Sequence, residues 1–182
     1  MEIVSTYIED LFVIQPDCFA DERGYFLETF RNDVFEDDFP DIKFCQDNES
    51  KSSFGTLRGL HYQLPPYDQT KLVRAIKGCV LDVAVDLRKN SSTFGKYFSI
   101  ELNEQNKNLL LIPKGFAHGF IVLSEEAIFS YKVDNYYNLD YESGILWNDT
   151  DLNIDWKINK KEIIVSEKDT KLSTFYNFVS PF

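Results

Sequence analysis

The chain has 182 residues, a formal net charge of -11 at pH 7 and a sequence pI of about 4.6. This length fits one domain, and a hydrophobic fraction of 43% with 16 Phe and 10 Tyr supplies a core without an unbroken apolar run that could cross a bilayer. The acidic balance argues against nucleic acid as a partner, although a few converging Arg and Lys can still bind one small anion.

The first residues, the cysteines and the lack of linkers predict a single-domain protein with reduced thiols. Residues 1–6 lack the basic start and apolar stretch of a signal peptide. Cys18, Cys45 and Cys79 are odd in number and far apart, with no C-x-x-C pair, so we expect reduced core or near-core thiols in a cytoplasmic protein. Without repeats, low-complexity tracts or Pro/Gly/Ser linkers, residues 1–182 are expected to form a single domain.

The predicted elements begin with a short helix and continue mainly as strands. A helix is expected over 32–38, behind an asparagine that can serve as its N-cap. Residues 79–87 alternate apolar and small or acidic side chains with the period of a strand that has two different faces. Turn residues bound the other candidate strands, which are 71–76, 98–102, 109–112, 119–123 and 127–133. Ser166-Glu167-Lys168-Asp169 resembles a capping box for a second helix. The pattern predicts an all-β antiparallel sandwich or barrel with a few short peripheral helices, whose interior is either filled or open at one mouth for a ligand.

The stretch 46–63 holds polar groups that a core would not choose. A guanidinium, Arg58, and an imidazole, His61, flank a short apolar strand, and unpaired burial of either would be costly. Strict alternation would point them to opposite faces. Gly59 lies between them, and a bulge at this glycine would bring both to one face.

Each candidate catalytic side chain also has a structural interpretation. His61 is either a hydrogen-bonded structural histidine or a functional one, and the nearby Arg58 and Lys71 favour function. For His118, a polar anchor at the start of a strand is an equally good interpretation. By composition alone, Tyr131 would be a core aromatic.

Several chemistries lack their signatures. With only His61 and His118 and no H-x-H or H-x-x-x-H pair, a metal site would need carboxylates to complete it, so we predict no catalytic metal. The sequences typical of dinucleotide binding, NTP hydrolysis and serine acyl transfer are absent as well.

Over nearly its whole length the chain resembles the dTDP-4-dehydrorhamnose 3,5-epimerase family of cupin-like β-barrels. The motifs that carry the resemblance are 19–28 (F-A-D-E-R-G-Y-F-L-E), 46–63, 71–74 (K-L-V-R), 82–86 (D-V-A-V-D), 112–120 (I-P-K-G-F-A-H-G-F), 131–132, 147–149 and 166–169 (S-E-K-D). The loops 65–70 and 138–143 depart from the family pattern, and both are expected near the mouth of the pocket.

The resemblance implies a fold and a set of roles. The fold would be a cupin-like antiparallel β-barrel, or jelly roll. His61 would be the base that removes the proton beside the ketone, Asp169 the carboxylate that orients it, and Tyr131 the acid on the opposite side. Lys71 would lie near the developing oxyanion at C4. The implied contacts to the nucleotide sugar are Arg23, Glu28, Gln46, Asn48, Arg58, His118, Glu142 and Lys168, with Arg23 supplied by the partner subunit of a homodimer.

The implied activity is that of an isomerase without cofactor, which converts dTDP-4-dehydro-6-deoxy-D-glucose to dTDP-4-dehydro-L-rhamnose in rhamnose biosynthesis. Histidine suits the base role because its ordinary pKa of about 6.5 leaves it mostly neutral near pH 7, and tyrosine suits the acid role because it stays protonated there. The alternatives are a mono-epimerase acting at C3 or C5 only, a cupin that binds a nucleotide sugar without catalysis, and a metal-dependent cupin.

Overall fold

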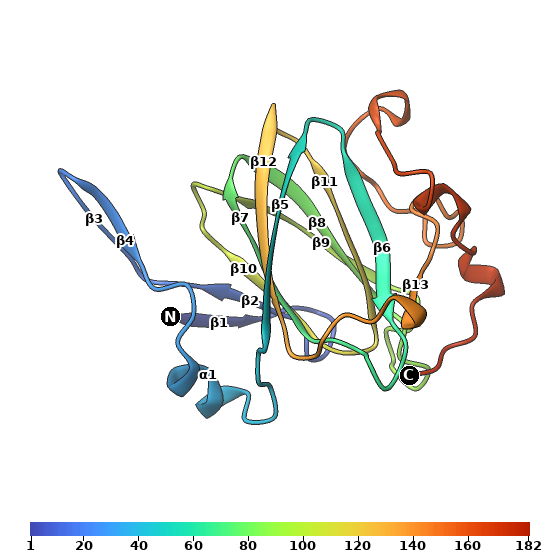
Figure 1. The fold of residues 1–182 in the computed structure, drawn as a ribbon, viewed down its shortest axis with the longest axis horizontal. Helices are drawn as coiled ribbons and strands as arrows, with labels where there is room; N and C mark the ends of the chain where they lie inside the picture. The colour runs from blue at the N-terminus through green and yellow to red at the C-terminus, as the bar shows by residue number, and fades with distance from the viewer.

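In this computed structural model, which describes all 182 residues, two antiparallel sheets face each other and enclose the core (Figure 1). The six-stranded sheet has the order β1-β2-β10-β7-β12-β5 and the five-stranded sheet the order β13-β6-β11-β8-β9. The strands of the first are β1 (Glu2–Ser5), β2 (Phe12–Gln15), β10 (Leu109–Ile112), β7 (Lys71–Lys77), β12 (Glu126–Val133) and β5 (Gln46–Ser53). Those of the second are β13 (Glu142–Gly144), β6 (Leu57–Gln63), β11 (Phe116–Val122), β8 (Cys79–Asp86) and β9 (Tyr97–Asn103). The expected all-β jelly roll is therefore confirmed.

The strands expected from sequence are all present, with ends shifted by up to three residues, and only 109–112 matches at both ends. β8 shows why its alternation was informative. Its even-numbered apolar residues Val80 and Ala84 join the core inside the barrel. The odd-numbered Leu81, Val83 and Val85 pack outside it, beneath the C-terminal segment. Both faces of this strand are consequently buried, and its two acidic residues are buried with them.

Helices are few, as expected. α1 (Asn32–Asp38) has the predicted bounds, but the prediction of an asparagine cap is wrong: Arg31 occupies the cap position and makes no capping bond, while Asn32 donates to Glu36 Oε1. The second predicted helix is only the 3₁₀ turn η3 (Asp169–Lys171). One capping bond does form there, because Ser166 Oγ accepts from the Asp169 N–H at 3.1 Å. The other 3₁₀ turns are η1 (Leu139–Tyr141), η2 (Lys160–Glu162) and η4 (Phe175–Asn177).

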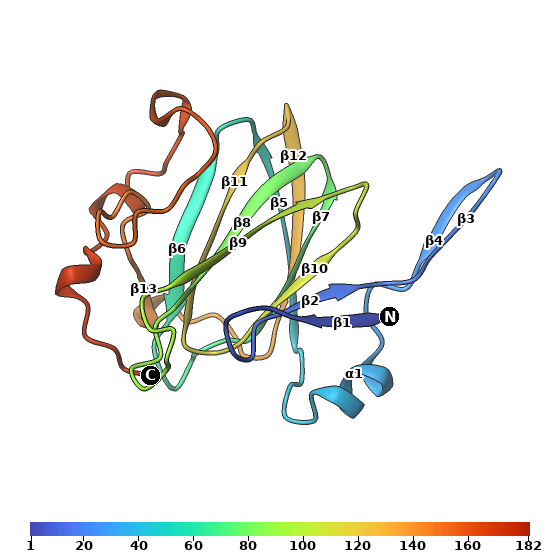
Figure 2. The ribbon, with the colours of Figure 1, turned by 180° about the vertical axis from the view of Figure 1, so that it is seen from behind.

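Two segments extend beyond the sheets. The hairpin of β3 (Cys18–Asp21) and β4 (Gly24–Leu27) projects away from the barrel, while the C-terminal segment follows the outside of the five-stranded sheet (Figures 1 and 2). The C-terminal segment is held by isolated parallel bridges, Thr56 to Ile164 and Ile145 to Ser173. None of the helices is long and apolar enough to span a bilayer.

The three cysteines are free, but the expectation that all three lie in or near the core is wrong. Cys18 and Cys45 are exposed, and Cys79 is half-buried. Cys18 lies on the projecting hairpin, where no core is available to cover it.

Candidate active site

A cavity of about 560 Å³ opens between the two sheets at one end of the barrel. Its walls come from β5, β6, β7, β11, β12 and β13, from the loops before β7 and β13, and from the C-terminal segment near η3. Eight of the side chains expected from sequence line this one space: Arg58, His61, Lys71, His118, Tyr131, Glu142, Lys168 and Asp169. The volume is in the range typical of small-molecule sites.

A bulge in β6 places Arg58 and His61 on the same wall. In the pairing of β6 with β11, His61 opposes His118 and Arg58 opposes Phe120, so two residues of β6 face one residue of β11. The extra residue lies at Gly59, where φ is +137° and an added Cβ would come within 2.5 Å of the Gly119 Cα. Only glycine tolerates this conformation and this close backbone approach. The expected bulge is present, and it turns a separation of three residues into a shared face.

His61 is held by Asp169. The two side chains meet at 2.7 Å between Nε2 and Oδ1, and Asp169 is 3% exposed. Burial alone would raise the pKa of Asp169, but the hydrogen bond from His61 and the charge of that ring outweigh it and hold the pKa below its ordinary value. Because the ionised carboxylate accepts, Nε2 carries the proton and Nδ1 is left as the basic nitrogen.

Tyr131 faces the cavity from the opposite sheet. It lies on β12 of the six-stranded sheet, whereas His61 lies on β6 of the five-stranded one, and both side chains line the same cavity. Burial raises the pKa of Tyr131 above its ordinary value, the Arg58 charge opposes this, and Glu142 adds to it. The phenol is therefore protonated at neutral pH and available as a proton donor.

Two cationic side chains can meet an anion in this cavity. Lys71 enters from β7, where burial lowers its pKa to about 8 while the charges of Asp82 and Glu142 act in the opposite direction. Arg58 uses its Nε–H on Ser52 Oγ at 3.1 Å and forms no ion pair with a carboxylate, so its terminal N–H groups remain free. Such groups suit a negatively charged oxygen or a phosphate.

The rim of the cavity is a small polar network around Glu142. Tyr137 Oη donates to Glu142 Oε2 at 2.7 Å, and Lys168 pairs with the same carboxylate. Burial raises the pKa of Glu142, but the bonds from Lys168 and Tyr137 bring it below its ordinary value. The hydrogen bond that Tyr137 donates to Glu142 raises the pKa of Tyr137 to about 12. The rim therefore combines a fixed negative charge with a lysine and an aromatic ring.

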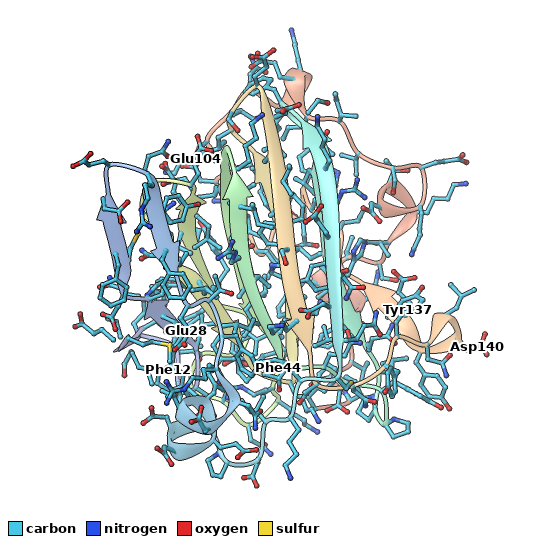
Figure 3. The ribbon with its side chains drawn as sticks, turned by 60° about the vertical axis from the view of Figure 1, so that its left-hand side comes forward. Phe12, Glu28, Phe44, Glu104, Tyr137 and Asp140 are labelled. Atoms are coloured by element: carbon cyan, nitrogen blue, oxygen red, sulfur yellow. The ribbon has the colours of Figure 1, made fainter.

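Four of the expected binding residues do not line the cavity. Arg23 is on the projecting hairpin, paired with Asp21, and its side chain is 89% exposed. Glu28 follows the hairpin, on the side of the molecule away from Tyr137 (Figure 3). Gln46 and Asn48 are bonded to each other on β5, and they share a strand face with Ser50, which does line the cavity.

The sequence reasoning missed three polar residues here. Tyr137 and Gln69 line the cavity from the loops 134–141 and 64–70, which the Gln69 amide joins by donating to the Asn135 carbonyl at 2.8 Å. Asp82 is completely buried and accepts from His118 Nε2. The available signal for Asp82 was an acid on a strand that is otherwise apolar. Gln69 belongs to the loop 65–70, which was expected near the mouth of the pocket, although the residue itself was not singled out. For Tyr137 no local pattern gave a signal.

The arrangement suits proton transfer at a carbon. A base and a phenol on facing walls can remove a proton from one side of a substrate and return one from the other, and a cation between them can stabilise the negative charge that develops. No group of three His, Cys, Asp or Glu side chains is arranged to hold a metal ion.

Comparisons with known proteins agree in pointing to one family. The sequence profile described as dTDP-4-dehydrorhamnose 3,5-epimerase matches residues 5–177. The dTDP-4-dehydrorhamnose 3,5-epimerase of Shigella flexneri is 51% identical over 170 residues, which cover 93% of each chain. The crystal structure of the Elizabethkingia anophelis enzyme of that name superposes with a TM-score of 0.93 at 50% identity, covering 97% of both chains. The Legionella pneumophila dTDP-6-deoxy-D-glucose-3,5-epimerase, solved in complex with dTDP-4-keto-L-rhamnose, superposes with a TM-score of 0.93 at 42% identity, covering 98% of this chain and 94% of that one.

Proposed function

Since this chain belongs to the dTDP-4-dehydrorhamnose 3,5-epimerase family, we propose that the cavity between its sheets is the active site and that His61 and Tyr131 exchange the protons. The protein is an isomerase that converts dTDP-4-dehydro-6-deoxy-D-glucose to dTDP-4-dehydro-L-rhamnose. The observation that carries the assignment of roles is the position of an imidazole and a phenol on facing walls of one cavity.

His61 starts the reaction. Its Nδ1 takes the proton from the carbon beside the C4 ketone, and Asp169, 2.7 Å from Nε2, stabilises the imidazolium that forms. A positioned base of this kind typically contributes about 10² to 10⁴ in rate. The negative charge moves to the C4 oxygen, where the Lys71 ammonium stabilises it electrostatically.

Tyr131 completes the inversion. Its phenol donates a proton to the carbon from the face opposite His61, which reverses the configuration. Once proton exchange with water has returned His61 to the neutral base and Tyr131 to the protonated phenol, the same pair serves the other carbon beside the ketone. Arg58, His118, Glu142 and Lys168 hold the nucleotide sugar so that each carbon in turn meets both groups.

The direct test is solvent exchange. In D2O with dTDP-4-dehydro-6-deoxy-D-glucose, deuterium should enter at both C3 and C5, as read by proton NMR of the product. His61→Ala should abolish exchange at both carbons. Label at a single carbon would instead indicate a mono-epimerase, and tight dTDP binding without any exchange would indicate a non-catalytic binding protein. Full exchange in the His61 variant would refute the assignment of the base.

A homodimer with exchanged hairpins is the second part of the proposal. The β3–β4 hairpin exposes Phe19, Tyr25 and Phe26 by 57% or more. An isolated two-stranded hairpin is only marginally stable in water, so a second chain is its natural cover. In that arrangement Arg23 and Glu28 would reach the partner's cavity rather than their own.

Complementation between subunits tests this arrangement. Arg23→Ala and His61→Ala chains should each be inactive as homodimers. If Arg23 acts in the partner's site, mixing and refolding them together should restore about a quarter of the wild-type activity, because half of the dimers are hybrids with one intact site each. No recovery on mixing, although the hybrid forms, would place Arg23 in its own chain's site.

We also propose that the protein is located in the cytoplasm, which is supported by its three free cysteines. Cell fractionation with an antibody to the chain would test it.

A further inference from the structure

A carboxylate with no assigned role lies next to the active-site cavity, in contact with His118, which lines it. Asp82 is on β8, between the core residues Val80 and Ala84, and none of its surface is exposed. Both of its oxygens contact His118 Nε2, at 3.1 and 2.9 Å. It pairs with no lysine or arginine. A buried carboxylate is strongly disfavoured unless some positive charge compensates it.

His118 does not supply that charge. The ring is 8% exposed, and burial lowers its pKa, although the charge and hydrogen bond of Asp82 act in the opposite direction. The charges of Lys71 and His61 lower the pKa of His118 further. At neutral pH the imidazole is therefore uncharged, and as the donor from Nε2 it brings no positive charge to Asp82.

Of the two cavity cations without a carboxylate partner, Arg58 and Lys71, it is Lys71 on β7 whose charged form is favoured by the Asp82 charge. It forms neither an ion pair nor a side-chain hydrogen bond of its own. The titratable and charged groups around it are Asp82 on β8 and the other ionisable residues that line the cavity, which are Glu49, Arg58, His61, Tyr62, His118, Tyr131, Tyr137, Glu142, Lys168 and Asp169. The two of these that favour its charged form are Asp82, with the larger effect, and Glu142.

The Glu142 carboxylate already has a cationic partner, whereas the Asp82 carboxylate has none. The Glu142 carboxylate pairs with Lys168 and accepts from Tyr137, so much of its charge is neutralised at the rim. Asp82 has only the neutral His118 as a partner. Lys71 thus depends mainly on Asp82 to offset the burial that would remove its proton.

We propose that Asp82 is a positioning residue that keeps Lys71 in its ammonium form inside the barrel, so that Lys71 can stabilise the negative charge on the substrate's C4 oxygen. The inference rests on the proposed function for the role of Lys71, but the coupling between Asp82 and Lys71 is a property of the protein without substrate. The two parts can therefore be tested separately.

The coupling is tested by titrating Lys71 in the substrate-free protein, following its side-chain Cε signal by NMR. The wild-type midpoint is expected near 8. Asp82→Asn keeps the shape and removes the charge, so the midpoint should fall by about one pH unit, the usual effect of losing a nearby opposite charge. Asp86→Asn is the matched control: Asp86 is equally buried on the same strand, but it is bonded to Arg88, Ser91 and Thr93 outside the cavity. It should leave the Lys71 midpoint unchanged.

The consequence for catalysis is tested by measuring kcat/KM at pH 6.5 and pH 8.5. A one-unit fall from pH 8 should cost Asp82→Asn about eightfold at pH 8.5 and less than about 1.5-fold at pH 6.5. An equal loss at both pH values with an unchanged NMR midpoint would show that Asp82 is merely structural. A lower midpoint without the pH-dependent loss would overturn the catalytic role of Lys71 while the coupling stands.

A second variant covers the case in which Asp82→Asn does not fold. Lys71→Arg carries a guanidinium that stays charged at all accessible pH values. Its residual activity should show no decline near pH 8. A decline that persists there in Lys71→Arg would mean that another group controls it, and it would overturn the proposal.

Discussion

Asp169→Asn removes one charge from the proposed catalytic pair and little else. Asparagine has the same shape, and its amide oxygen can still accept the proton on His61 Nε2 at the 2.7 Å position of the native carboxylate. The orientation and tautomer of the ring are thereby retained. What the variant loses is the negative charge beside the imidazolium that forms when His61 takes the substrate proton.

The size of the effect follows from this contact. A hydrogen bond to a charged group contributes about 1.5 to 3 kcal/mol, and Asp169 is buried, so solvent screens the pair little. At about 1.4 kcal/mol for each factor of ten, proton removal should slow by roughly 10- to 150-fold. Binding of dTDP should change little, because Asp169 bonds to His61, Gly59 and Ser166.

The assay is deuterium exchange from D2O at C3 and C5, with product NMR and a separate dTDP titration. Asp149→Asn is a matched control, since Asp149 is also buried but caps the backbone N–H groups of Asp151, Leu152 and Phe175 outside the cavity. Exchange within threefold of wild type in Asp169→Asn, or the same loss in Asp149→Asn, would refute the reasoning.

The remaining predictions concern the donor, the pH dependence and the packing. Tyr131→Phe should abolish inversion far more than exchange, so recovered substrate should carry deuterium with its configuration retained; product formed at the wild-type rate would exclude Tyr131 as the donor. The wild-type kcat/KM should decline as pH rises through about 8, because Lys71 loses its proton there, and a flat profile to pH 9 would contradict this. Asp169, whose pKa is lowered by folding, stabilises the native state above its unfolded pKa of about 3.9, so the difference in unfolding free energy between wild type and Asp169→Asn should shrink as urea titrations are moved from pH 7 to below pH 4. Gly144→Ala would bring a Cβ within 2.4 Å of the Leu60 carbonyl and 2.8 Å of Leu172, so the unfolding free energy should fall by about 1 to 3 kcal/mol, and an unchanged thermal midpoint would show that the C-terminal segment yields easily.

Local patterns were sufficient where one physical requirement dominated. The alternation in residues 79–87 and the apolar run 109–112 are demands of burial on a strand, and both segments form strands. The bulge at Gly59 was foreseeable because a polar residue on each side of a strand glycine must be reconciled with a single ligand-facing wall. The roles in proton transfer came from the family resemblance, because by composition alone Tyr131 would have been a core aromatic.

Other features were out of reach because they depend on contacts between distant segments. The second helix stops after one turn at η3, since residues 164–173 are tied to Thr56 and Ile145 rather than to one another. The N-terminal strands β1 to β4 are short and carry no clear alternation, and only pairing identifies them. Tyr137 lines the cavity from a loop that is joined to the loop of Gln69, more than 60 residues away in the sequence, by the hydrogen bond from Gln69 to the Asn135 carbonyl.

By itself the sequence determined the all-β class and the bulge at Gly59, because these depend on residue type and on spacing along the strands. Its motifs also carried the family resemblance, and that resemblance implied the class of chemistry and the catalytic side chains. The tertiary structure alone decided which nitrogen of His61 is basic, and that the completely buried Asp82 contacts His118. Each of these is a contact between segments that are far apart in the sequence. Burial also sets the charge states of Lys71 and His118, and burial arises only when the two sheets close over each other.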